Sequence, residues 1–209
     1  ANGTYLNNVK VEGSATLKRG DMIKVGSVAM KFLPKGDPER LTYDKLHEEA
    51  NTDGLTKVYN KRYFNDALEN EVKKSKVTGK PLTLIIFDLD HFKKLNDNYG
   101  HDAGDFVLKE KSRIIKEQGI RQGDIVARYG GEEFCLLLPG VDIHGAMQIA
   151  ERLREAIEST GGASVRSQEG LNITSSFGVS HIELGAHDTA ELLEQADAAI
   201  VGGQTGVHF

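Results

Sequence analysis

Two apolar runs on either side of a glycine-rich acidic segment predict a β-hairpin near the middle of the chain. The runs cover residues 125–127 and 134–138, and the segment between them contains Gly130, Gly131, Glu132 and Glu133. Glycine adopts the backbone conformations that a tight turn requires, and it leaves room for a ligand against the main chain. Adjacent carboxylates at such a tip repel each other, and a bound cation relieves the repulsion. The alternative is an acidic turn exposed to solvent.

A second acidic site follows another apolar stretch. Residues 82–88 have the pattern of a fully buried strand, and Asp88 lies at its end. If the hairpin strands pair beside this strand, Asp88, Glu132 and Glu133 converge. Phosphoryl and nucleotidyl transfer depend on positioning and charge neutralisation, and they need such carboxylates to hold metal ions.

Composition excludes several classes of protein. The 209 residues, with a net charge of −5, 39% hydrophobic and 27% charged residues, are enough for one core or a core plus a small module. The mild acidity argues against a nucleic-acid partner. No apolar run approaches the roughly 20 residues that span a bilayer, and no secretory signal opens the chain, so we expect no membrane partner. Cys135 is the single cysteine, which fits a reducing cytoplasm.

From residue 51 onward the chain alternates between helix-like and strand-like patterns. Besides the hairpin, the predicted elements are helices 62–76, 91–98, 103–118, 143–159 and 189–201, and strands 82–88 and 172–182. This order predicts an α+β fold with a mainly antiparallel sheet and helices on one face.

The first 50 residues have a different sequence pattern. Turn signals separate short strand-like runs up to residue 34, and 34 residues are too few to close a β-sandwich. A linker leads into residues 39–50, where Leu41, Leu46 and Ala50 have near-helical spacing. We therefore predict a partial β-sandwich segment over residues 1–34, a linker and connecting helix over 35–50, and the main domain over 51–209.

Ordered motifs along residues 51–209 resemble the GGDEF family of diguanylate cyclases. Such an order over about 150 residues is far more specific than any single short pattern. The motifs are Asp53-Gly54-Leu55-Thr56, Asn60-Lys61-Arg62, Asp88-Leu89-Asp90-His91-Phe92-Lys93, Asn96-Asp97-Asn98-Tyr99-Gly100-His101, Gly104-Asp105, Arg121-Gln122-Gly123-Asp124, Gly130-Gly131-Glu132-Glu133-Phe134 and Ile173-Thr174-Ser175-Ser176-Phe177-Gly178.

The resemblance implies a palm-like, ferredoxin-related fold. It also implies condensation of two GTP molecules into cyclic di-GMP and two pyrophosphates by a homodimer, in which each domain holds one GTP. In this family a connecting helix such as residues 39–50 commonly transmits signals by changing how two catalytic domains face each other.

Residues 1–34 resemble the C-terminal part of a forkhead-associated (FHA) domain, a β-sandwich that binds phosphothreonine peptides. Asn2-Gly3-Thr4-Tyr5 and Gly20-Asp21-Met22-Ile23-Lys24-Val25-Gly26 carry this resemblance. The phosphate-gripping Arg and Ser of that family lie upstream of the residues present. A phosphopeptide partner would therefore require the complete FHA domain.

The GGDEF resemblance implies a metal site and a catalytic pair. The cofactor is Mg²⁺, with Mn²⁺ as an alternative, held by Asp88, the backbone carbonyl of Leu89, and Glu132 or Glu133. Both glutamates also lie where the attacking 3′-hydroxyl would be deprotonated or steered, and the residues do not decide which one acts. Asp90 directly precedes a predicted helix, so we interpret it as the N-cap of that helix.

Substrate recognition also follows from the resemblance. The terminal phosphates of GTP would lie against the backbone of His91, Phe92 and Lys93, where the first turn of a helix offers N–H groups. Asn96 and Asp105 match the guanine-reading positions, and their groups can pair with the polar edge of guanine. On residue type alone, Lys93 would be a solvated helix cation and Asp105 an ordinary acid of a helix's first turn.

A separate inhibitory site for the product is implied by Arg121 and Asp124. Arginine's planar fork suits phosphate oxygens and guanine faces, and Asp124 would orient it or accept from the base. Arg152 falls where the family often has a second product-binding arginine. By itself, such a charge pair more often marks a surface salt bridge.

The end of the chain departs from the family pattern. An alignment without gaps puts Gln204 at the family's phosphate-binding Lys and His208 at its Arg. Losing two cationic contacts should weaken GTP binding. The leading hypothesis is a diguanylate cyclase under product feedback; the alternatives are a catalytically weak receptor for cyclic di-GMP and a phosphopeptide-binding adaptor.

Overall fold

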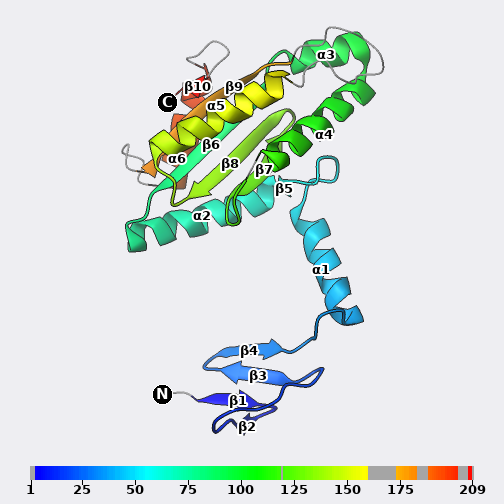
Figure 1. Cartoon of the computed structure of the whole chain (residues 1–209), viewed down its shortest axis with the longest axis vertical. Coiled ribbons are helices and arrows are strands. Elements are labelled where there is room, and N and C mark those ends of the chain that lie inside the picture. Colours follow the sequence, from blue (N-terminus) through cyan, green and yellow to red (C-terminus); the bar gives the residue numbers. More distant parts are fainter. Residues whose placement is uncertain (1–2, 119, 160–172, 183–187, 202–206, 209) are drawn as a thin grey trace. The chain divides into compact units, whose positions relative to one another are not determined.

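The computed structural model describes residues 3–118, 120–159, 173–182, 188–201 and 207–208 (Figure 1). The chain divides into two compact units, Ala1–Ala50 and Asn51–Phe209. No helix in the described ranges is both long enough and apolar enough to cross a lipid bilayer.

The N-terminal unit contains an antiparallel sheet and a helix. The sheet has four strands in the order β2-β1-β3-β4. Helix α1, Pro38–Asn51, agrees with the helix predicted over 39–50. None of its side chains is buried. The strands are β1 Thr4–Leu6, β2 Val9–Lys10, β3 Met22–Val25 and β4 Val28–Lys31. The resemblance of this segment to a partial FHA sandwich stays a prediction.

The second unit is built on a mixed sheet in the order β10-β9-β6-β8-β7-β5. Strand β6 runs antiparallel to β8 and β9, and β7 runs antiparallel to β8. Only the short outer strands β5 and β10 pair in parallel among the described residues, so the sheet is mainly antiparallel, as predicted. The strands are β5 Tyr59–Asn60, β6 Leu82–Leu89, β7 Ile125–Gly130, β8 Glu133–Pro139, β9 Ser175–His181 and β10 Val207–His208.

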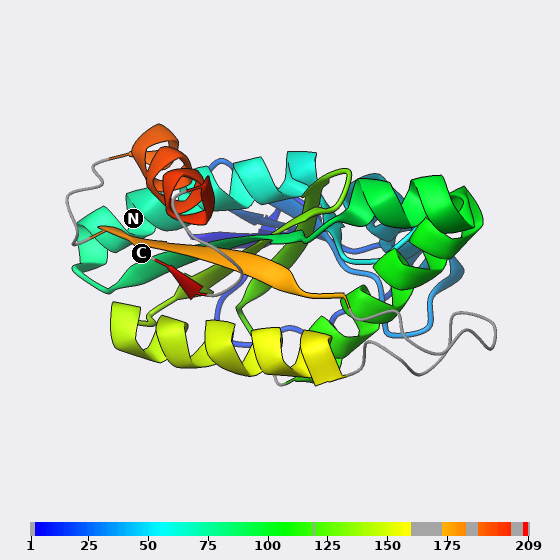
Figure 2. The same cartoon turned by 90° about the horizontal axis from the view of Figure 1, so that it is seen from above.

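Helices cover both faces of this sheet (Figure 2), so the prediction of helices on one face was wrong. Helices α2 and α6 pack on one face, and α4 and α5 contribute to the core on the other. The reason lies in β6, whose side chains are buried in both alternations, so that both of its faces need a cover. The helices are α2 Lys61–Thr78, α3 Phe92–Tyr99, α4 His101–Glu117, α5 Ile143–Ser159 and α6 Thr189–Val201.

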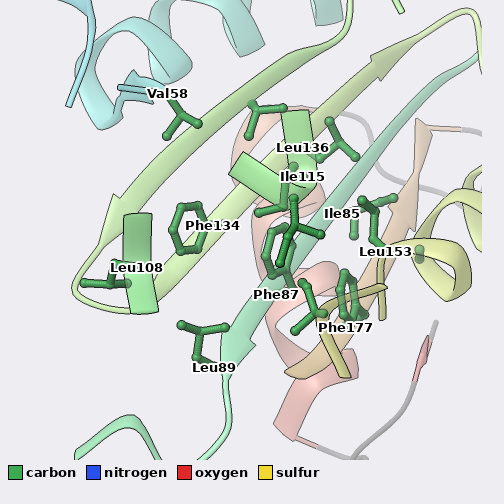
Figure 3. Close-up of a cluster of buried hydrophobic side chains, with 14 of the residues drawn as sticks. Val58, Ile85, Phe87, Leu89, Leu108, Ile115, Phe134, Leu136, Leu153 and Phe177 are labelled. Atoms are coloured by element: carbon green, nitrogen blue, oxygen red, sulfur yellow. The ribbon is translucent and has the colours of Figure 1, made fainter. Parts of the chain in front are cut away.

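Three stacked phenylalanines centre the larger core (Figure 3). The ring of Phe87 on β6 lies 5.4 Å from that of Phe134 on β8 and 4.7 Å from that of Phe177 on β9. Ile115 of α4 and Leu153 of α5 are fully buried in the same cluster. This packing fixes the three central strands against one another, and the ends of these strands carry the candidate site.

Three boundaries near the site differ from the sequence prediction. Helix α3 begins at Phe92, because His91 has a left-handed backbone with φ of 59°. Helix α4 begins at His101, and Gly100 alone separates it from α3. Gly100 has φ of 83°, which glycine adopts readily. The strand predicted over 172–182 begins at Ser175 in the described residues.

Candidate active site

A pocket of 400 Å³ lies where strand β6 ends and helix α3 begins. The turn between these two elements forms most of its lining, the hairpin tip supplies Glu132, and β9 supplies Ser176. Its lining residues are Asp88, Leu89, Asp90, His91, Phe92, Lys93, Glu132 and Ser176. The structure thus gathers most of the predicted metal and phosphate residues around one opening.

Asp88 lies in a row of polar side chains across the central strands. It is paired with Glu133 on β8 and with Ser176 on β9, so the three side chains project from the same face of the sheet. The Oδ1 atom of Asp88 is buried and has no hydrogen-bond partner. Burial, then the neighbouring charges of Glu132 and Glu133, raise the pKa of Asp88 to about 6. A cation bound here would offset both causes.

The hairpin tip brings both glutamates to Asp88, as the sequence predicted. A register shift between Arg128 and Gly130 makes the tip irregular, and Gly131 has a positive φ of 47°. Glu132 is half-buried and lines the pocket, whereas Glu133 is exposed.

Arg128 ties this tip to the start of the domain, a role that sequence reasoning missed. Its Nε donates to the carbonyl of Gly131 at 2.8 Å, and its Nη1 lies 3.3 Å from Asp53 Oδ1. Asp53 also accepts from the backbone N–H and the hydroxyl of Thr56. Asp53 belongs to a quoted motif and Arg128 to the predicted hairpin, but no local pattern shows that these residues, 75 positions apart, meet.

Asp90 is not a helix N-cap, so that prediction was wrong. Its carboxylate accepts from the hydroxyl of Thr174 at 2.5 Å and from that of Ser176 at 2.8 Å. The N-cap position is His91, which makes no side-chain cap. The Asp90 carboxylate is thus held by hydroxyls of β9 and of the residue before it. The first turn of α3, which has no side-chain cap, suits an anion.

The predicted phosphate residues form the turn into α3. His91 and Lys93 are exposed, and Phe92 is buried under the turn. All three line the pocket. The N-terminus of α3 therefore faces the same opening as Asp88.

The predicted guanine-reading residues lie on α3 and α4. Asn96 Oδ1 is buried without a hydrogen-bond partner, and a Cβ on Gly104 would approach it to 2.0 Å. Gly104 thus allows the two helices to pack closely at Asn96. Asp105, the next residue, is exposed. Neither Asn96 nor Asp105 is among the residues that line the pocket.

The predicted product-binding residues lie away from this pocket. Asp124, buried except for 5% of its side chain, accepts from the backbone N–H of Arg121 at 2.9 Å and pairs with its guanidinium at 3.4 Å. The guanidinium side chain of Arg121 is 56% exposed. Arg152 is exposed on α5. Asp124 therefore orients an arginine that remains open to solvent.

The tail residues cannot be placed in the site. Gln204 lies outside the described residues. The backbone of His208 belongs to β10, but its side chain lies outside the description as well.

The donor set suits a hard cation that completes its shell with ligand oxygens. Within the described ranges, no three His, Cys, Asp or Glu side chains are gathered closely enough to form a metal site on their own. Mg²⁺ commonly takes one or two carboxylates, with substrate phosphates and waters as the rest. The unpartnered Oδ1 of Asp88 beside Glu132 fits that requirement.

Comparisons with known proteins agree with this geometry. The family described as diguanylate cyclase, GGDEF domain, matches residues 50–203. The response regulator PleD of Caulobacter vibrioides is 39% identical over 162 residues, which are 77% of this chain and 35% of PleD. Diguanylate cyclase DgcP of Pseudomonas aeruginosa is 39% identical over 153 residues, 73% of this chain and 22% of DgcP. The chain thus spans about a third or less of these relatives.

Solved structures show the same fold. The coiled coil and GGDEF domain of DgcB from Caulobacter crescentus, in complex with c-di-GMP, has a TM-score of 0.74 at 29% identity, covering 81% of this chain and 91% of that one. Diguanylate cyclase SiaD from Pseudomonas aeruginosa, in complex with its activator SiaC, has a TM-score of 0.70 at 34% identity, covering 78% and 62%. Since the family profile covers well over half of the chain, this protein belongs to the diguanylate cyclase GGDEF domain family.

Proposed function

We propose that this protein condenses two GTP molecules into cyclic di-GMP and two pyrophosphates. The observation that carries the proposal is the buried, unpartnered Oδ1 of Asp88 beside Glu132, in the pocket of a GGDEF-family chain. A buried carboxylate oxygen without a protein donor suits a cation, and nucleotidyl transfer uses cations to neutralise phosphate charge.

The proposed roles follow from position in the pocket. Asp88, Glu132 and the carbonyl of Leu89 would hold Mg²⁺, with Glu133 as a further candidate ligand. The bound ion would neutralise developing charge on the phosphate oxygens. The N–H groups of His91, Phe92 and Lys93 would hold the terminal phosphates.

The proposed reaction has two equivalent halves. The 3′-oxygen of one GTP forms a bond to the α-phosphorus of the other, the bond from that phosphorus to the pyrophosphate oxygen breaks, and Glu132 or Glu133 takes or steers the 3′-proton. Each domain holds one GTP, with Asn96 and Asp105 reading the guanine, so a homodimer is required for both bonds.

We further propose that the product inhibits the enzyme at a second site. Arg121, held by Asp124, presents an exposed guanidinium that suits a phosphate or a guanine face. Arg152 would supply a second cation from the same or another subunit. Residues 51–209 would form the catalytic domain, residues 35–50 the connection that transmits a signal, and residues 1–34 the end of an FHA domain.

Incubation of the purified protein with GTP and Mg²⁺, followed by mass spectrometry of the nucleotides, tests the reaction. We expect cyclic di-GMP and pyrophosphate from the parent and neither from Asp88→Asn. Tight binding of added cyclic di-GMP without any product formation from GTP would instead favour the receptor function. Absence of both activities would refute the proposal.

A further inference from the structure

The turn that lines the pocket between β6 and α3 adopts a backbone that needs external support. His91 has φ of 59°, a left-handed conformation that costs a residue with a side chain on the order of 1 kcal/mol. Such conformations persist where the surrounding structure fixes the neighbouring residues. The residue that precedes His91 is Asp90, so its contacts decide how the turn is held.

Asp90 is fixed through three hydrogen bonds to β9 and the residue before it. Its backbone N–H donates to the carbonyl of Thr174 at 3.0 Å, which extends the β6–β9 pairing one step beyond Leu89 and Ser175. Its carboxylate accepts from the hydroxyls of Thr174 and Ser176. Because Thr174 and Ser176 are two positions apart, both hydroxyls project from the same face of β9, one for each carboxylate oxygen.

We propose that Thr174 and Ser176 are positioning residues for the triphosphate of the substrate, which act through Asp90. By fixing Asp90 they hold His91 in its left-handed conformation and aim the N–H groups of the first turn of α3 into the pocket. This inference rests on the proposed function, since it assigns a triphosphate to that turn.

Variants at Thr174 distinguish the positioning role from direct contact with the ligand. Ser176 lines the pocket and could touch a nucleotide itself, whereas Thr174 is not among the lining residues. A change at Thr174 therefore acts on the pocket through Asp90. Thr174→Val removes the hydroxyl and keeps the shape, and Thr174→Ser keeps the hydroxyl and removes the methyl group, so the two variants form a matched pair.

The test is calorimetric titration of the full chain with 3′-deoxy-GTP and with GMP, each with Mg²⁺. The 3′-deoxy compound keeps the triphosphate and cannot form the 3′ bond, while GMP lacks the terminal phosphates. We expect Thr174→Val to weaken 3′-deoxy-GTP binding about tenfold, equivalent to 1.4 kcal/mol. Binding of GMP should not change, and Thr174→Ser should match the parent for both nucleotides. Thr174→Ala, which also lacks the hydroxyl, replaces Thr174→Val if that variant does not fold.

The other outcomes have distinct meanings. If the parent does not bind 3′-deoxy-GTP, the proposed function fails and the inference fails with it. If the parent binds and Thr174→Val binds equally well, the inference alone is overturned. Equal losses for 3′-deoxy-GTP and GMP, or a Thr174→Ser variant as weak as Thr174→Val, would show a general packing role and would also overturn it.

Discussion

Replacing Asp88 by Asn should stabilise the metal-free protein at neutral pH while it abolishes the proposed catalysis. The change keeps the size of the side chain and removes its charge. The pKa of Asp88 is raised to about 6 from its ordinary value of 3.8, so the folded state binds this proton more tightly than the unfolded state does. The contribution of Asp88 to the free energy of unfolding is therefore largest below about pH 4 and is lost as pH rises through 6.

The size of the effect follows from that pKa shift. A shift of about two pKa units corresponds to about 3 kcal/mol, because each unit is 1.36 kcal/mol. Solvent screening of this half-buried carboxylate reduces the expected gain to about 1–2 kcal/mol. For a unit of this length, that gain raises the melting temperature by roughly 2–8 °C.

Thermal unfolding in the presence of a chelator measures the prediction, at pH 7.5 and again at pH 4. Asp88→Asn should melt higher than the parent at pH 7.5, and the difference should vanish at pH 4. Asp97→Asn, which removes the same charge from an exposed position on α3, is the matched control and should change little. Adding Mg²⁺ should raise the melting temperature of the parent and not that of Asp88→Asn. The reasoning would be refuted if Asp88→Asn melted no higher than the parent at pH 7.5. It would also be refuted if the variant melted higher than the parent by the same amount at both pH values.

Three further perturbations test other parts of the molecule. Lys111 is buried with its Nζ 2.6 Å from the carbonyl of Ile157, and burial lowers the pKa of Lys111 to about 8. The free energy of unfolding of the parent in urea should rise from pH 8 to 10, because the unfolded state still holds the proton there. Lys111→Met should lose this pH dependence. Arg128→Ala breaks the contacts to Asp53 and Gly131, so it should lower the free energy of unfolding in urea by about 1–3 kcal/mol and reduce turnover of GTP. Arg121→Ala should weaken cyclic di-GMP binding at least about tenfold by calorimetry, and equal affinity would discard the inhibitory site.

Much of the fold could be predicted from the sequence because the strongest sequence signals are local. The apolar run of residues 82–88 and the glycine hairpin were predicted as strands, and convergence of the carboxylates depended on their pairing. The structure meets this condition, because β6 pairs with β8 and sets Asp88 opposite Glu133. The same run is buried in both alternations, so it already implied helices on both faces of the sheet. The prediction of one covered face did not use that information.

The support of Asp90 could not be predicted from the residues around it. An acid directly before a helix has the local pattern of an N-cap, and that pattern favours a hydrogen bond within the next three residues. Asp90 instead binds Thr174, 84 positions away, because the pairing of β6 with β9 continues past the end of both strands and brings two hydroxyls to its carboxylate. The local and the tertiary partners compete, and only the register of the sheet decides between them.

Three residues at the pocket and on the helix that follows it share a physical property. Asp88 is a buried charge without a partner, His91 has an unfavourable backbone, and Asn96 has a buried oxygen that lacks a donor. Each feature costs stability in the unliganded protein, so packing alone does not favour any of them. The three lie on β6, on α3 and in the turn between them. A metal-bound guanine nucleotide would supply a cation for Asp88, anionic oxygens for the turn at His91 and a donor for Asn96. Relief of three separate costs by the proposed ligand would account for the departure of this short stretch of chain from local rules.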